Sequence, residues 1–303
     1  MLAVLLALAA AAGFGGSDFT AGLGARTASV IRVTILAEAA ATLLSLLIVP
    51  WVSPRGPSLA SAGWGAAGGI SGVAAAMALY LGFRHAAFSV ASTLSAVSSA
   101  ALSVVAGLLL GERPAGLSLA GIALALPAIA AVSASPQRPK PAGEAGAESR
   151  GPRATPAGHG TTGRHLTGVG YGLAAGAGFA LYYFCLNEAG SDSGLWPVLI
   201  ATLAGLVEAA VIGAATGQLG LPSGRALGLA AATGVAGVTG TAAFFAATHN
   251  GELAATAVIT SLYPAVTILL ARVLLAERLT PVRLAGLCLA AASVGLIAAG
   301  GTG

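Results

Sequence analysis

Three carboxyl groups that lie inside long apolar runs are the residues of this chain with the clearest capacity for chemistry. Asp18 follows the glycine-rich stretch 13–16, Glu38 follows Arg32 by six residues, and Glu208 sits in the middle of an apolar run. A charge at the centre of a membrane helix costs roughly 2.5–3.5 kcal/mol on insertion scales. Such carboxyl groups either exchange protons or bind a cation, or they hold helices together as hydrogen-bonded neutral acids. Both interpretations stay open for Asp18, and the second is favoured for Glu38 and Glu208.

A second group of side chains brings hydroxyls, aromatic rings or a guanidinium into the same runs. Serines 92, 95 and 99 share one helix face and predict either a polar cavity wall or close helix packing. Tyr263 precedes Pro264, which frees a backbone carbonyl one turn back, so this proline predicts a hinge and a binding site in a broken helix. Packing is the alternative role for the ring. The full set of cavity candidates is Asp18, Tyr80, Ser92, Ser95, Ser99, Tyr182, Tyr183, Phe244, Tyr263 and Arg272.

Several kinds of chemistry are not indicated by the sequence. Cys185 and Cys288 have no metal-ligand spacing. The chain has no nucleotide-binding loop, so ATP is not expected to drive it directly. Its four histidines form no cluster of the kind that a membrane-embedded enzyme would need. We expect no catalytic residues, no metal, no prosthetic cofactor and no nucleic-acid partner, and we expect that the chain is not an enzyme.

The elements that carry these residues are long apolar helices. The 303 residues are 56% hydrophobic and 8% charged, against about 25% charged in soluble domains, and the mean hydropathy is +0.89. The apolar runs are too long, and alternate too little, for barrel strands. They predict an all-α membrane protein with ten transmembrane helices, at 2–22, 28–50, 60–82, 86–110, 115–134, 166–187, 195–216, 226–247, 252–275 and 281–300.

A polar segment and an internal repeat divide the chain. Residues 135–165 are rich in Pro, Gly and charge and predict a disordered linker between five-helix repeats at 1–134 and 166–303. When the chain is shifted by 165 positions, nine of the seventeen residues at 109–125 match. Because each half has an odd number of helices, the second half must enter the membrane from the opposite face. The sequence therefore predicts two inverted five-helix repeats, which are typical of transporters that work by alternating access.

The repeat includes a Glu-Arg pair after the fourth and ninth predicted spans. Glu112 and Arg113 form the first pair, and Glu277 and Arg278 form the second. A gate or a substrate contact is one interpretation. We favour the simpler one, a helix end and tight turn at which Arg is favoured by the helix dipole and Glu is solvated.

The motifs resemble those of a known family. The ten spans, the duplication, the stretch "GFGGSDF" at 13–19, and a proline thirteen positions before a Glu-Arg-Leu triplet at 277–279 resemble the EamA-like branch of the drug/metabolite transporter superfamily. Ser99 in place of a first-half proline, and Phe14 where Trp is common, depart from the pattern. The resemblance implies a cavity lined by helices one, three, four, six, eight and nine, and export or exchange of small metabolites.

Taken together, these features predict a multi-pass protein of the inner or plasma membrane. It would export or exchange small organic metabolites or drugs by alternating access, as a secondary active transporter. A membrane-embedded enzyme or lipid-handling protein is the alternative. The expected partners are a small-molecule substrate and the lipid bilayer, and a homodimer stays open. Alternate loops on one side hold twelve of the fourteen Lys and Arg residues and those on the other hold two, which predicts a cytoplasmic linker and both termini outside.

Overall fold

The computed structural model describes residues 1–85, 88–133, 160–276 and 279–300, and within these it leaves the side chains of 80, 82–93 and 160–166 undescribed. All regular secondary structure among the described residues is helical, as predicted. The helices are α1 (Leu2–Gly24), α2 (Val30–Val52), α3 (Leu59–His85), α4 (Phe88–Leu109), α5 (Gly116–Ser133), α6 (Gly160–Glu188), α7 (Trp196–Ala215), α8 (Arg225–Thr248), α9 (Leu253–Thr260), α10 (Tyr263–Leu274) and α11 (Pro281–Gly300).

The predicted spans are confirmed as membrane-crossing helices by length and composition. Nine described segments are long and apolar enough to cross a membrane, with α9 and α10 together counting as one, and the apolar stretch Leu94–Leu109 of α4 is a shorter tenth. The largest shift in a boundary concerns α6, which begins at Gly160 within the predicted linker, six residues before the predicted span. Residues 134–159 lie outside the described part of the chain.

The ninth predicted span consists of two helices. α9 ends at Thr260, and α10 begins at Tyr263 with Pro264 in its first turn. Proline has no N–H to donate to the carbonyl one turn back, and it disfavours the helical conformation in the residue before it. Ser261 and Leu262 instead close a tight turn, in which the Leu262 N–H donates to Ile259 O at 3.1 Å. The break therefore falls where the sequence places proline.

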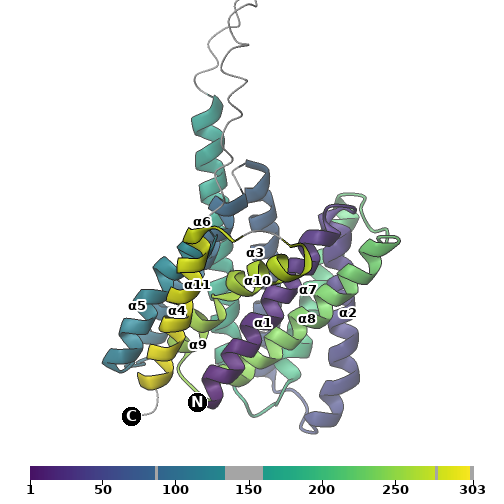
Figure 1. The fold of residues 1–303 in the computed structure, drawn as a ribbon. Helices are drawn as coiled ribbons and strands as arrows, with labels where there is room; N and C mark the ends of the chain where they lie inside the picture. Colours follow the sequence, from purple (N-terminus) through teal and green to yellow (C-terminus); the bar gives the residue numbers. More distant parts are fainter. Residues whose placement is uncertain (86–87, 134–159, 277–278, 301–303) are drawn as a thin grey trace, which may run out of the picture.

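The helices pack in pairs that join the two halves of the chain. α1 packs along α8, α3 along α6, and α5 along α11, while α2 contacts both α7 and α8. Figure 1 shows both termini at one end of the bundle and the start of α6 projecting from the other. We call these ends the terminus face and the α6 face. The N-terminus of α1 and the C-terminus of α4 thus lie at the terminus face.

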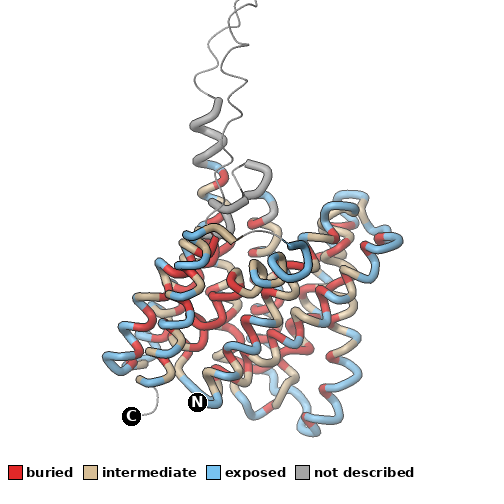
Figure 2. The backbone as a smooth tube through the Cα atoms, in the orientation of Figure 1, coloured by how far each residue is buried: buried red, intermediate tan, exposed pale blue. Residues whose placement is uncertain are grey.

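The buried residues lie along the middle of the bundle, and its outer faces are apolar and exposed (Figure 2). Leu46 and Leu47 of α2 are 56% and 61% exposed, and Val207 and Val211 of α7 are 57% and 62% exposed. An exposed apolar surface of this extent on a helical bundle is the surface that a lipid bilayer covers.

Candidate functional site

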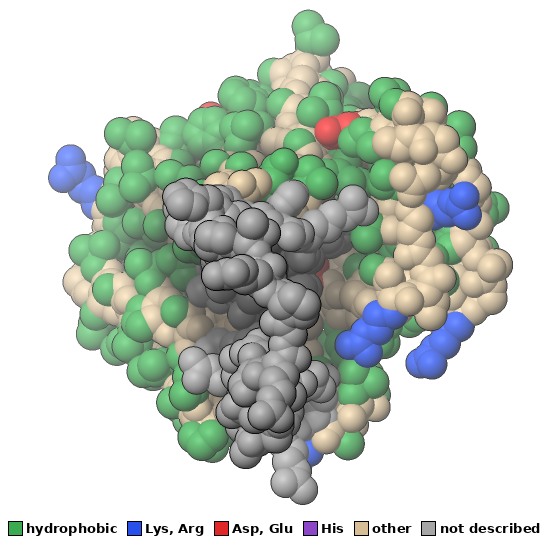
Figure 3. Space-filling view, turned by 90° about the horizontal axis from the view of Figure 1, so that it is seen from above, with side chains coloured by type: hydrophobic (Ala, Val, Ile, Leu, Met, Phe, Trp, Pro, Cys, Tyr) green, Lys and Arg blue, Asp and Glu red, His purple; other side chains and the backbone are tan. Residues whose placement is uncertain are grey.

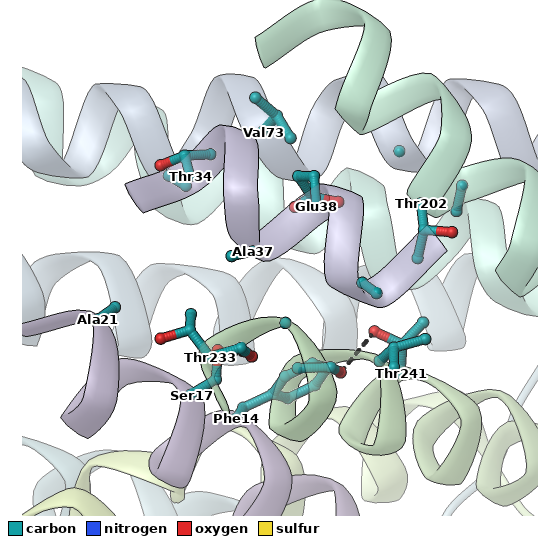
Figure 4. A pocket seen from close by; sticks show the side chains of 18 of the residues that line it. Phe14, Ser17, Ala21, Thr34, Ala37, Glu38, Val73, Thr202, Thr233 and Thr241 are labelled. Atoms are coloured by element: carbon teal, nitrogen blue, oxygen red, sulfur yellow. Dashed lines mark hydrogen bonds between the residues drawn. The ribbon is translucent and has the colours of Figure 1, made fainter. Parts of the chain in front are cut away.

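A cavity of about 190 Å³, which we call the larger cavity, lies between the two halves of the chain. Three helices of the first half, α1, α2 and α3, and three of the second, α6, α7 and α8, form its walls. In Figure 4, Thr34 and Glu38 of α2 lie on the opposite side of the cavity from Ser17 of α1 and Thr233 of α8. The polar residues that line the cavity are Ser17, Asp18, Thr34, Glu38, Tyr182, Thr202, Thr233 and Thr241.

A smaller cavity of about 80 Å³ shares part of this wall. Phe14, Asp18, Ala76, Phe179 and Tyr182 line both cavities, and Leu79, Tyr183 and Tyr263 line only the smaller one. The exposed Asp18 side chain thus borders both spaces. The two cavities bring one predicted carboxylate, Asp18, next to three of the predicted tyrosines.

The threonine hydroxyls in the larger cavity donate their hydrogens back to their own helices. A helical Thr commonly bonds a carbonyl three or four residues earlier. Thr34 donates to Val30 O at 3.0 Å, Thr202 to Leu199 O at 2.9 Å, Thr233 to Leu229 O at 2.9 Å and Thr241 to Gly237 O at 3.1 Å. These hydroxyl oxygens keep free lone pairs as acceptors.

The two other hydroxyls of the larger cavity are also engaged as donors. Ser17 Oγ of α1 donates to Thr233 O of α8 at 3.0 Å. The Tyr182 hydroxyl lies 2.6 Å from Thr241 Oγ1. Because the Thr241 hydrogen is given to its own helix, Tyr182 is the donor in this pair. Every hydroxyl hydrogen of the larger cavity is thereby used within the protein.

The carboxyl groups of Asp18 and Glu38 are the charged groups of the cavity. Neither makes a hydrogen bond or an ion pair with another described residue, and the described lining contains no Lys, Arg or His. A carboxylate without a partner is costly in a low-dielectric interior. The arrangement therefore suits proton binding or a positively charged ligand.

Aromatic rings form one wall beside Asp18. The rings of Tyr183 and Phe244 are 4.5 Å apart between centroids, Tyr182 and Tyr183 are 5.6 Å apart, and Phe14 and Tyr183 are 6.4 Å apart. Phe244 is fully buried behind this wall and lines neither cavity. The structure thus places Phe244 in packing behind the tyrosines.

The predicted serines lie away from the cavities, as far as their side chains are described. Ser95 and Ser99 of α4 are buried, and Ser99 Oγ donates to Ala96 O at 3.0 Å. A Cβ built on Gly176 of α6 would lie 2.7 Å from the Ser95 carbonyl oxygen, so Ser95 sits in a close helix contact. The side chains of Ser92 and Tyr80 lie outside the described residues.

The remaining predicted residues are dispersed. Glu208 of α7 is partly buried, lines neither cavity, and has a buried Oε2 with no hydrogen-bond partner. Arg272 is exposed in the last turn of α10 and lines neither cavity. Tyr263 lines the smaller cavity at the break before Pro264, and there Thr267 Oγ1 donates to Gly15 O of α1 at 3.1 Å. The broken helix is thus tied to α1.

The structure corrects the interpretation of Glu112 as a solvated residue at a helix end. Gly111, at φ +92°, turns the chain after α4, and the Glu112 N–H donates to Gly107 O at 3.0 Å. The Glu112 carboxylate is partly buried and accepts hydrogen bonds from the backbone N–H groups of Leu253 and Ala254, the latter at 2.9 Å. We call this contact the Glu112 clasp. It joins the end of α4 to the start of α9 at the terminus face.

The clasp satisfies backbone donors that the first turn of α9 leaves unpaired. Glu252 precedes that turn and offers no side-chain cap. Partial burial raises the pKa of Glu252, and the Glu112 carboxylate raises it further. Glu277 and Arg278, the second pair of the repeat, lie outside the described residues.

Sequence reasoning missed part of the cavity wall. The resemblance gave helices one, three, four, six, eight and nine, whereas the larger cavity also uses α2 and α7, and no described residue of α4 lines either cavity. Small side chains on α2 and α7, such as Ala37 and Ala201, leave this space open, and Glu38 reaches it. The spacing of Thr233, Gly237 and Thr241 on one face of α8 is the signal that was available.

The fold and the site define the class of protein: a multi-pass helical membrane protein with a carboxylate-bearing cavity between its two halves. Residues 166–299 match the model of the EamA-like transporter family, part of the drug/metabolite transporter superfamily. The resemblance seen in the sequence is therefore confirmed for residues 166–299, the second half of the chain, which are similar to this family.

Solved structures share the fold. A protein of known crystal structure superposes with a TM-score of 0.73 over 97% of this chain and 95% of its own, at 14% sequence identity. At 14% identity this likeness shows a shared fold and carries no information about the solute. A comparison with curated proteins finds no match.

Proposed function

We propose that this protein is a secondary transporter that moves small organic solutes across the cell membrane by alternating access around the larger cavity. The observation that carries the proposal is that both halves build the cavity from equivalent positions. Seven pairs of lining residues are separated by 165 positions: Phe14 and Phe179, Ser17 and Tyr182, Ala37 and Thr202, Gly69 and Gly234, Gly72 and Gly237, Val73 and Val238, and Ala76 and Thr241. A site on a pseudo-two-fold axis can open to either side when the halves exchange conformations.

Helix packing supports the same relation between the halves. A Cβ built on Gly13 of α1 would lie 2.6 Å from Gly240 Cα and 2.8 Å from Ala236 O in α8. A Cβ built on Gly178 of α6 would lie 3.3 Å from Ala75 Cα and 3.3 Å from Ser71 O in α3. All three pairs, 13 with 178, 240 with 75 and 236 with 71, are separated by 165 positions.

The turns that follow α4 and α10 support it as well. Gly111 has φ +92°, and Ala276, which lies 165 positions later, has φ +54°. A left-handed conformation is unusual for a residue with a Cβ and is disfavoured by roughly 1–2 kcal/mol. The second half thus keeps the turn geometry of the first without its glycine. The inverted repeat is the simplest account of these shared features.

The two ends of the cavity differ in this conformation. The lining residues of α1 lie in its later half and those of α2 between its start and its midpoint, which places both sets nearer the α6 face, whereas those of α6 and α7 lie nearer the terminus face. At the terminus face, the Glu112 clasp ties the two halves together. The proposal is that this conformation is closed at the terminus face, and that transport requires the clasp to open.

The orientation in the membrane follows from the basic residues. Five described arginines lie near the helix ends at the α6 face, namely Arg26, Arg32, Arg225, Arg272 and Arg283. Figure 3 shows basic side chains around that face. Arg55 and Arg113 belong to the opposite face. Since cytoplasmic loops carry the excess of Lys and Arg, the α6 face is cytoplasmic in this proposal. The conformation is then inward-facing, which suits an exporter or exchanger that loads its solute from the cytoplasm.

A transport screen tests the function. Purified protein in liposomes is expected to take up, or to exchange, a member of a panel of amino acids, nucleosides and organic cations above the rate of protein-free liposomes. Asp18→Asn and Glu38→Gln should lower that uptake at least tenfold, whereas Glu188→Gln, which removes a carboxylate outside the cavities, should retain it. No uptake of any solute, or equal loss in all three variants, would contradict the proposal.

A further inference from the structure

We propose that the solute of the larger cavity is a small organic cation that carries N–H donors, such as a primary ammonium, an amidinium or a guanidinium. The inference rests on the proposed function for the cavity's role and adds the chemical class of its substrate. It starts from the balance of hydrogen-bond donors and acceptors in the described lining.

With Asp18 and Glu38 ionised, the larger cavity presents acceptors and no free side-chain donor among its described residues. Its threonines donate within their own helices, Ser17 donates to Thr233 O, and Tyr182 donates to Thr241 Oγ1. What faces the space are hydroxyl lone pairs and the oxygens of Asp18 and Glu38. A ligand that fits this wall must bring the donors itself, because an acceptor-only ligand would leave its own buried polar groups unpaired.

The charges point to the same class of ligand. Asp18 and Glu38 have no ion-pair partner among the described residues, and the described lining holds no basic side chain to receive an anion. An ammonium or guanidinium would form charge-assisted hydrogen bonds to either carboxylate, and such bonds are stronger than those between neutral groups. The rings of Phe14, Phe179 and Tyr182 line the same space and can receive the cation on their faces.

The size of the cavity narrows the class further. A volume of about 190 Å³ is below the roughly 300–1,000 Å³ of pockets that enclose drug-sized ligands. Metabolite-sized amines fit this limit better than polycyclic drugs do. Asp18 also borders the smaller cavity, where Tyr183 and Tyr263 leave room of about 80 Å³ for one end of a longer chain.

Matched probes test the inference by equilibrium binding to purified protein, without any requirement for transport. The probes are n-butylammonium (a cation with N–H donors), tetramethylammonium (a cation without them), n-butanol (neutral) and butyrate (an anion). We expect n-butylammonium to bind at least tenfold more tightly than each of the other three. Tighter or equal binding of butanol, butyrate or tetramethylammonium, or no binding of n-butylammonium, would overturn the inference.

Variants locate the binding in the cavity. Asp18→Asn and Glu38→Gln should each weaken n-butylammonium binding at least tenfold, and Glu188→Gln, which removes a carboxylate that lines neither cavity, should leave it within twofold of the unsubstituted protein. Equal affinity in all four proteins would overturn the assignment to the cavity. If the protein binds n-butylammonium in this pattern but transports nothing, the proposed function fails and this inference stands. If it transports a neutral or anionic solute and binds no cation, the inference fails and the proposed function stands.

Discussion

Replacing Glu112 with Ala should open the terminus face. The carboxylate accepts hydrogen bonds from the Leu253 and Ala254 N–H groups at the start of α9. Removing a helix cap costs about 0.5–2 kcal/mol, and one to two kcal/mol corresponds to a factor of about 5–30 in a two-state population. In the proposed function the clasp stabilises the conformation that is closed at the terminus face. Glu112→Ala should therefore raise the ratio of open to closed molecules at this face by about that factor.

The assay measures how fast a cavity cysteine reacts from the terminus face. Val238 lines the larger cavity and makes no side-chain hydrogen bond, so Val238→Cys is placed in a chain whose native Cys185 and Cys288 have been replaced. A small membrane-impermeant thiol reagent is added on the side of the terminus face. Glu112→Ala should speed labelling about 5–30-fold, whereas Arg113→Ala, which removes the exposed neighbour, should leave the rate unchanged. An unchanged rate in Glu112→Ala would refute the view that the clasp closes this face.

Two further predictions concern packing and pH. Gly234→Ala would place a Cβ against the carbonyl oxygen of Ala37 and should destabilise the bundle by about 1–3 kcal/mol, whereas Gly228→Ala on the same helix meets open space and should gain up to about 1 kcal/mol. Thermal unfolding in detergent compares the two, and equal melting temperatures would contradict the α2–α8 contact. Because folding raises the pKa of Glu252, the folded state binds a proton at this carboxyl more tightly than the unfolded state does. The protein is therefore more stable at low pH, and this stability is lost as the pH rises above the ordinary pKa of 4.5. Glu252→Gln should remove that loss, and a pH dependence of the melting temperature identical to the unsubstituted protein's would contradict the raised pKa of Glu252.

Much of the fold could be predicted because its main determinants are local. Apolar run lengths indicated the helices, and Pro264 indicated where the ninth span divides, since the missing N–H acts on the immediate backbone. The repeat also indicated which positions of the two halves correspond. Gly69 and Gly234, for example, are 165 positions apart in the chain, and both line the larger cavity.

The site was less predictable because it depends on contacts between distant segments. Glu38 was expected to be structural, yet small residues of neighbouring helices leave it facing the cavity. Glu112 was expected to be solvated, but its carboxylate meets backbone N–H groups 141 and 142 positions later in the chain. No local pattern in the sequence encodes either contact. Asp18 was the site residue best identified in advance, because its charge stands alone beside a glycine-rich stretch.

A disulfide across the Glu112 clasp tests alternating access most directly. A Cβ built on Gly107 of α4 lies 3.1 Å from the Cβ of Ala254 in α9, somewhat below the roughly 3.5–4.5 Å of disulfides. It would also meet the Glu112 carboxylate, so a cysteine at this position displaces that side chain and the disulfide takes the place of the clasp. Gly107→Cys and Ala254→Cys should therefore cross-link the two halves at the terminus face.

The measurement is n-butylammonium exchange by the cross-linked protein in liposomes, before and after reduction, with native Cys185 and Cys288 replaced. The account predicts that the oxidised protein still binds n-butylammonium but does not exchange it, and that a reductant restores exchange. Exchange at the full rate with the cross-link complete would contradict the account, because the solute would then cross without the terminus face opening.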